Sequence, residues 1–352
     1  MLSTIPKLVD KNFVIGFIIP VLLGAGGILA LLQDLSSVPP TYESLLETAD
    51  FSKLTIIALS LWVAAILLLI MNHLLYRSLE GYFGPFKRSA WQNLLRKEYL
   101  ADRAKLSATY EVITNPNLPA PSELKRGYYN DVRRFHESWP SHPHLVLPTR
   151  FGNVIRAFET YANEIYGADS IPTWLRLQGV MPKDVRMLVD DARTQVDFFV
   201  NVWFLTVLFI VIAMVRFVSE AYSALPNPKQ MLFCSWGFAL SAAGGLLVCK
   251  LAYVGAIERA RAWGDLVKSA FDLYLPELAS KLGYELPPSA FQRKRFWDAV
   301  TSSFLYQEPI RPEEWQTAKS VDIAAPEPKV SNAEEKDAPI EDDNKDGEGS
   351  SG

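Results

Sequence analysis

Formal charge is missing from four long stretches of this 352-residue sequence, although charged residues make up 21% of it. A helix needs roughly 20 apolar residues to cross about 30 Å of hydrocarbon, and helices of soluble cores rarely reach that length without a charge. The pattern therefore predicts an all-α integral membrane protein with four transmembrane helices. These helices are placed at about 13–32, 54–75, 198–218 and 231–253.

The first stretch lacks the features of a cleaved signal peptide. Its apolar run is longer than the hydrophobic region of such peptides, which is roughly 7–15 residues, and no clear small-residue cleavage site follows it. We therefore predict a retained span at 13–32.

Recognisable catalytic motifs are also absent. The sequence has no Walker loop, no GxGxxG, no GxSxG, no HExxH and no EF-hand loop. No acidic or basic residue falls at the centre of a span, which argues against proton-coupled transport and voltage sensing. These absences favour a non-enzymatic protein, and no catalytic residue and no cofactor is predicted.

Cysteine and histidine are scarce. The two cysteines lie fifteen residues apart on one predicted helix, too far from each other for a disulfide. Three of the four histidines and one carboxylate gather in a short proline-containing segment: His136, Glu137, His142 and His144. Zinc sites draw on such residues, but no second cluster completes the set. The segment is interpreted as a loop surface, and no metal ligand is predicted.

Lysine and arginine are distributed unevenly around the spans. They precede the first span and follow the second and fourth, whereas the first-to-second and third-to-fourth connections carry few. Because loops rich in Lys and Arg stay in the cytoplasm, both termini and the long segment 76–197 are predicted to be cytoplasmic.

The chain divides into five predicted parts. A transmembrane hairpin at 1–75 precedes a cytoplasmic helical insertion at 76–197, and a second transmembrane hairpin occupies 198–254. A cytoplasmic helical region follows at 255–318, and the remainder, 319–352, is an acidic tail. Cap residues and apolar periodicity predict cytoplasmic helices at 87–113, 122–135, 149–167 and 289–306, and extend the third and fourth spans over 182–197 and 254–282.

The start of the helix at 87–113 sets aromatic and apolar side chains, including Trp91, Leu94 and Tyr99, among basic residues. Such a mixture suits a helix in the lipid headgroup region, and it equally suits an amphipathic helix packed on its neighbours. Both readings stay open from the sequence.

The acidic tail dominates the charge of the chain. Residues 319–352 carry ten acidic residues, four lysines and no aromatic residue, a composition typical of disorder. The tail's net charge of −6, taken from the chain's −4, leaves +2 for the rest. The segment 76–197 holds 17 basic and 14 acidic residues, a net of only +3. Anionic membrane lipids are therefore the expected partners of its basic residues, and nucleic acid is not.

Charged residues flank the second hairpin. Asp197 opens the third span and Lys250 closes the fourth, so antiparallel packing predicts both at the cytoplasmic boundary, while Arg216 and Glu220 lie at the opposite end. These membrane-edge charges are interpreted as structural anchors whose long side chains reach water.

Small residues recur along two spans. At four-residue intervals or in clusters, they let helix backbones approach closely in lipid and permit homo-oligomers. The residues are Gly24, Gly26 and Ala30 in the first span, and Gly237, Ser241 and Gly245 in the fourth.

Two segments resemble stretches of an uncharacterised family of bacterial multi-span membrane proteins without an assigned activity. They are LPTRFGNVIRAFETYANEIYG at 147–167 and AYVGAIERARAWGDLVKSAFDLYLPELASKLGYELP at 252–287, together 57 residues. The resemblance implies an inner (cytoplasmic) membrane protein of a bacterium. It transfers no catalytic or binding residue.

Polar residues inside these two segments form the candidate site for a ligand or protein partner. The candidates are Arg150, Asn153, Arg156 and Glu159 on one helix, with Glu258, Arg259 and Arg261 just after the fourth span. We predict that they form a polar cluster at the cytoplasmic membrane face. The alternative is a solvated helix face with i, i+3 ion pairs.

Three functions remain open. The leading hypothesis is an integral membrane scaffold or signalling component whose cytoplasmic helical domain binds a protein partner. An oligomeric ion channel or membrane-permeabilising effector is the second, although no polar residue lies at the centre of a span to form a water path. The third is a lipid-modifying enzyme at the interface that uses His73, Glu258 or the loop 136–144, although no nucleophile–base spacing supports it.

Overall fold

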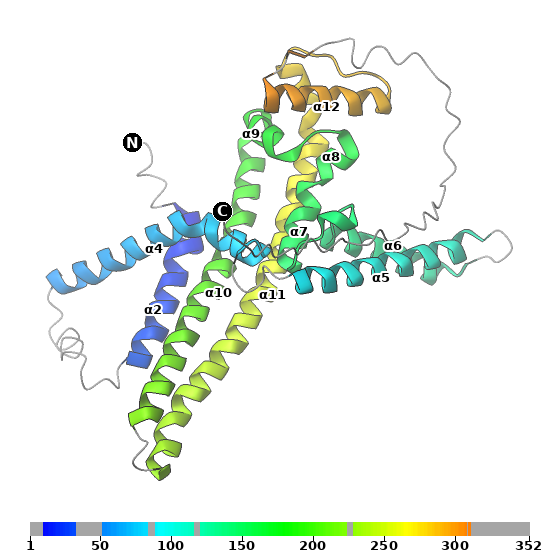
Figure 1. The fold of residues 1–352 in the computed structure, drawn as a ribbon. Helices are drawn as coiled ribbons and strands as arrows, with labels where there is room; N and C mark the ends of the chain where they lie inside the picture. The colour runs from blue at the N-terminus through cyan, green and yellow to red at the C-terminus, as the bar shows by residue number, and fades with distance from the viewer. Residues whose placement is uncertain are drawn as a thin grey trace, which may run out of the picture.

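The computed structural model describes residues 10–32, 51–83, 89–115, 120–223, 228–307 and 309–310. Within these ranges the chain forms helices and no strand (Figure 1), which confirms the all-α prediction. The predicted acidic tail at 319–352 lies outside the described residues. The elements are α1 (Lys11–Phe13), η2 (Val14–Ile18), α2 (Ile19–Leu32), α4 (Phe51–Glu80), α5 (Ser89–Thr114), α6 (Ser122–Ser138), η4 (Pro143–Leu145), α7 (Arg150–Glu159), α8 (Tyr161–Tyr166), α9 (Ser170–Val180), α10 (Lys183–Ser223), α11 (Pro228–Lys281) and α12 (Ala290–Tyr306).

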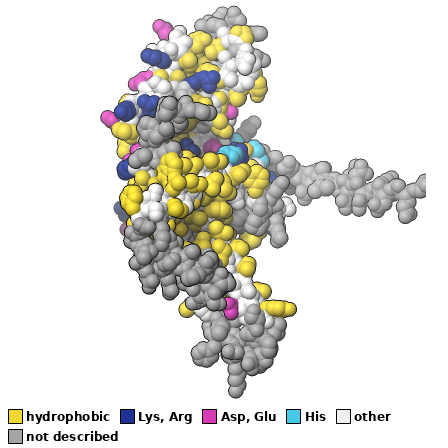
Figure 2. Space-filling view, turned by 90° about the vertical axis from the view of Figure 1, so that its left-hand side faces the viewer, with side chains coloured by type: hydrophobic (Ala, Val, Ile, Leu, Met, Phe, Trp, Pro, Cys, Tyr) yellow, Lys and Arg dark blue, Asp and Glu magenta, His cyan; other side chains and the backbone are white. Residues whose placement is uncertain are grey.

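Among the described residues, four helical segments are long and apolar enough to cross a membrane, the number that the sequence predicts. They are Lys11–Leu31, Leu54–Glu80, Lys183–Glu220 and Gly237–Lys281. Apolar side chains remain exposed along all four. On the face drawn in Figure 2, hydrophobic side chains cover the middle of the molecule and continue below it, whereas Lys and Arg gather in the upper part.

The two longest helices, α10 and α11, form the axis of the molecule. They contain 41 and 54 residues, run side by side in opposite directions, and continue without a break from their apolar parts into their polar parts (Figure 1). Their close approach depends on small residues. A Cβ atom on Gly255 would lie 2.5 Å from the Phe199 ring, and one on Gly245 would lie 2.7 Å from Ile210. Gly26 and Gly237, by contrast, face open space.

A backbone carbonyl left free by a proline connects the first apolar helix to α10 through a hydrogen bond. Pro20 has no N–H, so the carbonyl of Gly16 loses the donor four residues ahead, and the backbone takes a π-helical turn at Val14–Ile18. The buried side chain of Asn201 supplies the missing hydrogen bond, with Nδ2 donating to the Gly16 oxygen at 2.8 Å.

The helix α4 crosses the start of the first span instead of lying along it (Figure 1). Its described side chains from Phe51 to Ser60 are all exposed, and burial begins only at Ala65. One half of α4 therefore packs on the molecule, and the other half projects from it.

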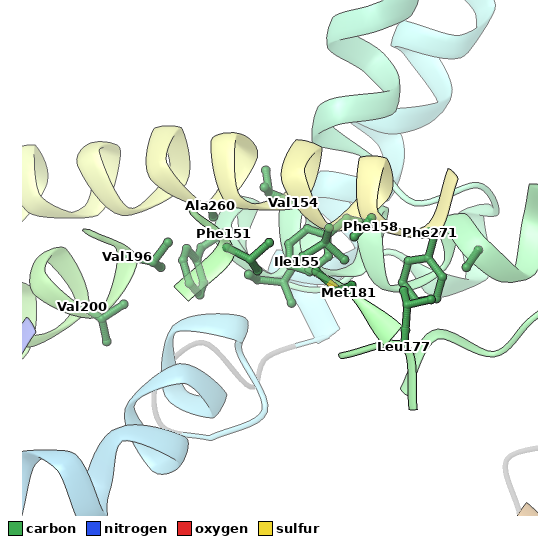
Figure 3. Packing of buried hydrophobic residues seen from close by; sticks show 14 of the residues in the cluster. Phe151, Val154, Ile155, Phe158, Leu177, Met181, Val196, Val200, Ala260 and Phe271 are labelled. Atoms are coloured by element: carbon green, nitrogen blue, oxygen red, sulfur yellow. The ribbon is translucent and has the colours of Figure 1, made fainter. Parts of the chain in front are cut away.

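The main core lies where α7 and α9 pack against the polar parts of α10 and α11 (Figure 3). Seven of the ten residues of α7 are buried, because neighbouring elements surround that helix on nearly every side: Phe151, Gly152, Asn153, Val154, Ile155, Ala157 and Phe158. The core continues from the spans into the polar part without a gap, through Val200, Val196 and Phe271.

A second, smaller core joins α5 to α6. Tyr99 and Leu95 are buried there beside Trp139, and the Tyr99 hydroxyl donates to the carbonyl of Ser141 at 3.0 Å. At these residues α5 is therefore an amphipathic helix packed on its neighbours, one of the two interpretations that the sequence left open. Trp91 and Leu94 remain about half exposed at the start of the helix.

Most helix boundaries follow the predicted caps. Ser289 precedes α12, and Gly167 ends α8 in the left-handed region with φ 77°. The helix predicted at 149–167 is divided in two at Thr160, and α9 was not predicted.

Candidate functional site

The end of α4 and the start of α7 meet at a tight junction. Thr149 caps α7, since its hydroxyl oxygen accepts from the Gly152 N–H at 3.0 Å, and the same hydroxyl donates to the Leu79 carbonyl at 2.6 Å. A Cβ atom on Gly152 would lie 2.7 Å from the carbonyl oxygen of Glu80. Only glycine permits this approach, which brings the last turns of α4 over one side of α7.

A cavity of about 480 Å³ opens beside this junction, where the apolar stretches of α4 and α10 end. We call it the boundary cavity. It is lined by the C-terminal turns of α4, by one side of α7, and by Tyr82, Ile171, Arg193 and Trp263.

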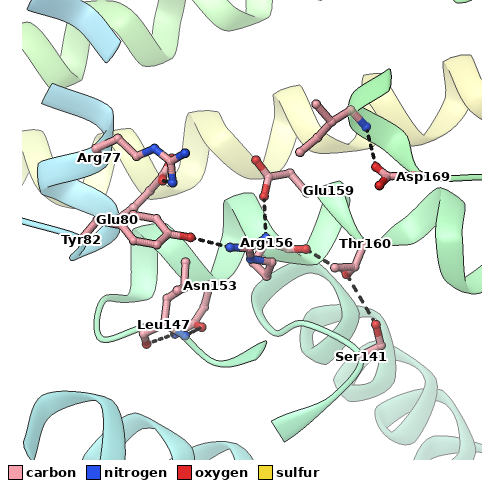
Figure 4. Close-up of polar contacts among 11 residues, drawn as sticks. Arg77, Glu80, Tyr82, Ser141, Leu147, Asn153, Arg156, Glu159, Thr160 and Asp169 are labelled. Atoms are coloured by element: carbon pink, nitrogen blue, oxygen red, sulfur yellow. Dashed lines mark hydrogen bonds and ion pairs between the residues drawn. The ribbon is translucent and has the colours of Figure 1, made fainter. Parts of the chain in front are cut away.

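Four charged side chains and one tyrosine form the polar wall of the boundary cavity (Figure 4). Arg156 donates to the hydroxyl of Tyr82 and pairs with Glu159 at 3.5 Å. The guanidinium of Arg77 lies 4.5 Å from the centre of the Tyr82 ring and 3.9 Å from the Glu80 carboxylate. Burial raises the pKa of the Glu159 carboxyl, and the Glu80 carboxylate adds to the rise, while Arg156 opposes it.

Two further residues bring donors to the cavity. Arg193 forms no ion pair with Glu80 or Glu159, and its guanidinium lies 6.0 Å from the centre of the Trp263 ring. Its charge also acts on the buried Asp197. The indole Nε1 of Trp263 and the Nε of Arg156 are buried without an acceptor among the described residues. Buried donors of this kind are uncommon, because each loses its hydration without a replacement.

A buried carboxylate lies directly behind the cavity and fixes α4 to α10. Asp197 is 7% exposed, and its Oδ1 accepts from Asn72 Nδ2 at 3.0 Å and from the Tyr76 hydroxyl at 2.7 Å. The structure thus places Asp197 at a helix junction. Lys250, predicted near it, is exposed, and no ion pair joins the two among the described residues.

The other predicted membrane-edge pair is present. Arg216 lies 3.7 Å from Glu220, one turn ahead on α10, and its guanidinium lies 5.1 Å from the centre of the Phe238 ring. Both contacts hold Arg216 against the end of the α10–α11 pair.

The four candidates on α7 do not share one face. Arg156 and Glu159 line the boundary cavity, whereas Arg150 is exposed and pairs with Glu98 of α5 at 2.7 Å. Asn153 is fully buried, accepts from the Leu147 N–H at 2.7 Å and donates to the carbonyls of Leu147 and Thr149. Its predicted place on the polar side is wrong, because it closes the loop that leads into α7.

The candidates on α11 belong to a separate cavity of about 660 Å³ between α6 and α11, which we call the α6–α11 cavity. Arg261 lies 2.6 Å from Glu258 there and donates to the Ser138 hydroxyl at 3.0 Å. Trp263 is two residues farther along the helix, so it points to the opposite side of α11. Arg259 is exposed and lines neither cavity. The predicted single cluster is therefore two sites.

The histidine segment does not gather metal ligands. His142 lies 3.2 Å from Glu164 and stacks on His144, while His136 is on α6, where burial lowers its pKa with Lys268 contributing. Within the described ranges, no three His, Cys, Asp or Glu side chains lie close enough together to hold a metal ion.

Comparison of the chain with protein-family models, curated proteins and solved structures finds no match.

Sequence reasoning missed Arg193, Tyr82 and Trp263 as site residues. They are far apart in sequence and share no motif, so only the packing of α4, α7, α10 and α11 brings them together. A usable signal existed for Arg193, which lies one turn before Asp197 on the cytoplasmic extension predicted for the third span.

Proposed function

We propose that this chain is an integral protein of the inner (cytoplasmic) membrane, with both termini in the cytoplasm, that acts as a scaffold or signalling component. The observation that carries the proposal is the continuity of α10 and α11. The same two helices supply apolar spans and the core of a helical domain beyond them. A partner bound to that domain is thereby fixed to the membrane helices without a flexible linker.

The partner surface we favour is on α9. Ile171 and Leu175 are 68% and 74% exposed, and they border a mainly apolar groove that Trp174 and Phe271 also line. Exposed apolar residues beside a groove are typical of protein-binding surfaces.

The orientation can be tested with single cysteines in a variant that carries Cys234→Ala and Cys249→Ala. A membrane-impermeant maleimide is expected to label Tyr222→Cys in intact spheroplasts and Ser289→Cys only after permeabilisation. Both positions are exposed. Labelling of Ser289→Cys in intact spheroplasts would overturn the proposed orientation.

The partner surface can be tested with a photo-crosslinking amino acid at position 175 in native membranes. A reproducible protein adduct is expected there and not at position 273. Leu273 is a comparably exposed apolar residue, two residues from Phe271 and therefore on the other side of α11. Equal or absent adducts at the two positions would contradict a partner on α9.

The alternative functions gain less from the structure. His73 lines the boundary cavity, but Glu258 lies in the α6–α11 cavity, so the residues suggested for a lipid-modifying enzyme are not assembled. For the channel alternative, two buried polar side chains of α10 are already used to join helices, with Asn201 bound to Gly16 and Asp197 to α4.

A further inference from the structure

The boundary cavity has more positive than negative charge. Its lining includes three arginines, Arg77, Arg156 and Arg193, against two glutamates, Glu80 and Glu159, which leaves a formal charge of +1. The ion pairs of Arg77 and Arg156 are long, at 3.9 and 3.5 Å. Neither Glu80 nor Glu159, the two carboxylates of the lining, forms an ion pair with Arg193. Arg193 interacts electrostatically with the buried Asp197 behind the cavity, but that carboxylate lies more than 4.0 Å from its guanidinium, so an anion that enters the cavity can pair with Arg193 directly.

The unpartnered donors point to the same kind of ligand. Trp263 Nε1 and Arg156 Nε are buried N–H groups that lack an acceptor, and both residues line the cavity. Together with Arg193, these N–H groups can donate hydrogen bonds to several oxygen atoms of one ligand group. A phosphate offers these oxygens, and planar guanidinium groups match it well.

The edge of the cavity is apolar. Leu69 and Ile70 of α4 line it, and Ile70 is 70% exposed. They lie about two turns before Arg77, on the stretch of α4 that we place in the membrane. A ligand whose phosphate reaches the arginines can therefore keep a hydrocarbon chain against Leu69 and Ile70.

We propose that the boundary cavity binds a phosphate group carried by a membrane amphiphile, with the phosphate at Arg193, Arg156 and Trp263 and a hydrocarbon chain along Leu69 and Ile70. The apolar edge favours a phospholipid over a soluble phosphate compound. This inference rests on the membrane orientation proposed above, which the cysteine labelling tests separately. If the cysteines are labelled as expected but no phosphate compound binds, this inference is wrong and the proposed orientation stands.

The test is native mass spectrometry of the full chain purified in detergent, titrated with three probes. Dioctanoyl phosphatidylglycerol carries phosphate and chains, glycerol 3-phosphate carries phosphate alone, and dioctanoylglycerol carries chains alone. The first probe is expected to bind at least tenfold more tightly than either of the others.

Arg193→Gln is the informative variant, because Arg193 is exposed and forms no ion pair with Glu80 or Glu159 of the cavity. It is expected to weaken binding of dioctanoyl phosphatidylglycerol about tenfold. Arg186→Gln is the matched control. Arg186 lies seven residues earlier on the same side of α10, is exposed, and does not line the cavity. The Arg186→Gln variant is expected to bind dioctanoyl phosphatidylglycerol as tightly as the unaltered chain does.

Trp263→Phe provides a second variant that keeps a ring against Phe158, where the two ring centres are 5.0 Å apart, and removes only the N–H donor. We expect several-fold weaker binding of the phospholipid and unchanged binding of dioctanoylglycerol.

Two outcomes would overturn the proposal. If Arg193→Gln and Arg186→Gln bind the phospholipid equally, the cavity is not its site. If glycerol 3-phosphate binds as tightly as the phospholipid and Arg193→Gln weakens both, the ligand is a soluble phosphate compound, and the membrane part of the proposal is wrong.

Discussion

The boundary cavity and the α6–α11 cavity lie on opposite sides of α11 and contain the same kinds of side chain. The α6–α11 cavity balances three arginines against three carboxylates, with contacts as short as 2.6 Å between Arg261 and Glu258. The boundary cavity leaves one arginine unmatched, and its pairs are longer. Only the boundary cavity is lined by residues from an apolar stretch of helix, Leu69 and Ile70 of α4. Similar composition therefore supports a closed ion-pair cluster on one side and an anion site on the other.

The strongest way to break this comparison is to separate α4 from α7. Gly152→Val places new atoms where even a Cβ would be 2.7 Å from the Glu80 carbonyl, so we expect a loss of stability of about 3 kcal/mol. The readout is the thermal unfolding midpoint in detergent, together with phospholipid binding, which should disappear with the junction.

Gly127→Val serves as the control for that change. Gly127 is exposed on α6 and has open space around it, so its effect on stability is expected to stay within about 0.5 kcal/mol. Equal destabilisation by the two valines would show that the junction is not held as tightly as the structure indicates.

The next largest effect is expected from Asp197→Ala, which leaves Asn72 and Tyr76 without their buried acceptor. We expect a loss of about 2 kcal/mol, measured as a lower unfolding midpoint. Asp191→Ala on the same helix removes an exposed ion pair with Lys11 at 3.1 Å and should cost less than about 0.5 kcal/mol. A reversal of this order would argue against Asp197 as the anchor of α4.

A smaller effect distinguishes the two cavities directly. Arg77→Gln is expected to weaken phospholipid binding about fivefold, because it removes one cation from the boundary cavity. Arg261→Gln, on the other side of α11, is expected to leave that binding unchanged while it opens the contact with α6. Native mass spectrometry of both variants measures the difference, and a larger effect of Arg261→Gln would reverse the assignment.

The smallest expected effect concerns pH. The pKa of Glu159 is raised in the folded chain, so its ionised form is disfavoured there and lowers stability at pH values above the folded pKa. That loss is relieved as pH falls through the folded pKa towards the ordinary value of 4.5. The unfolding midpoint of the unaltered chain should therefore rise relative to that of Glu159→Gln when the pH is lowered from 8 to 5. An unchanged difference would contradict the raised pKa.

The helices were predictable because their signals are local. Charge-free length marks the four long apolar helices, and caps such as Thr149, Gly167 and Ser289 mark where the other helices begin or end. The helix α9 was missed although Asp169 caps it, with the Ile171 N–H donating to the Asp169 carboxylate at 3.0 Å. It carries Pro172 in its first turn and exposes Ile171 and Leu175, so its apolar residues do not read as a buried stripe.

The site was less predictable because it depends on contacts between distant segments. Periodicity places Asn153 opposite the apolar residues of α7, but the loop before the helix and the end of α4 cover that side too. Arg156 and Glu159 were recognised, whereas their cavity neighbours Arg193 and Trp263 come from helices whose rotation about their axes no sequence pattern specifies.

The length of α11 has a mechanical consequence. At 1.5 Å per residue its 54 residues make a rod of about 80 Å, well over twice the thickness of a bilayer core. A helix of that length acts as a lever, and a tilt of about 5° at one end displaces the other by roughly 7 Å. Pro276 interrupts the hydrogen bonding of α11 only close to its C-terminal end. Because α7 and α9 pack on the polar portion of α11, a small change of tilt at its apolar end would be enlarged into a movement of those two helices.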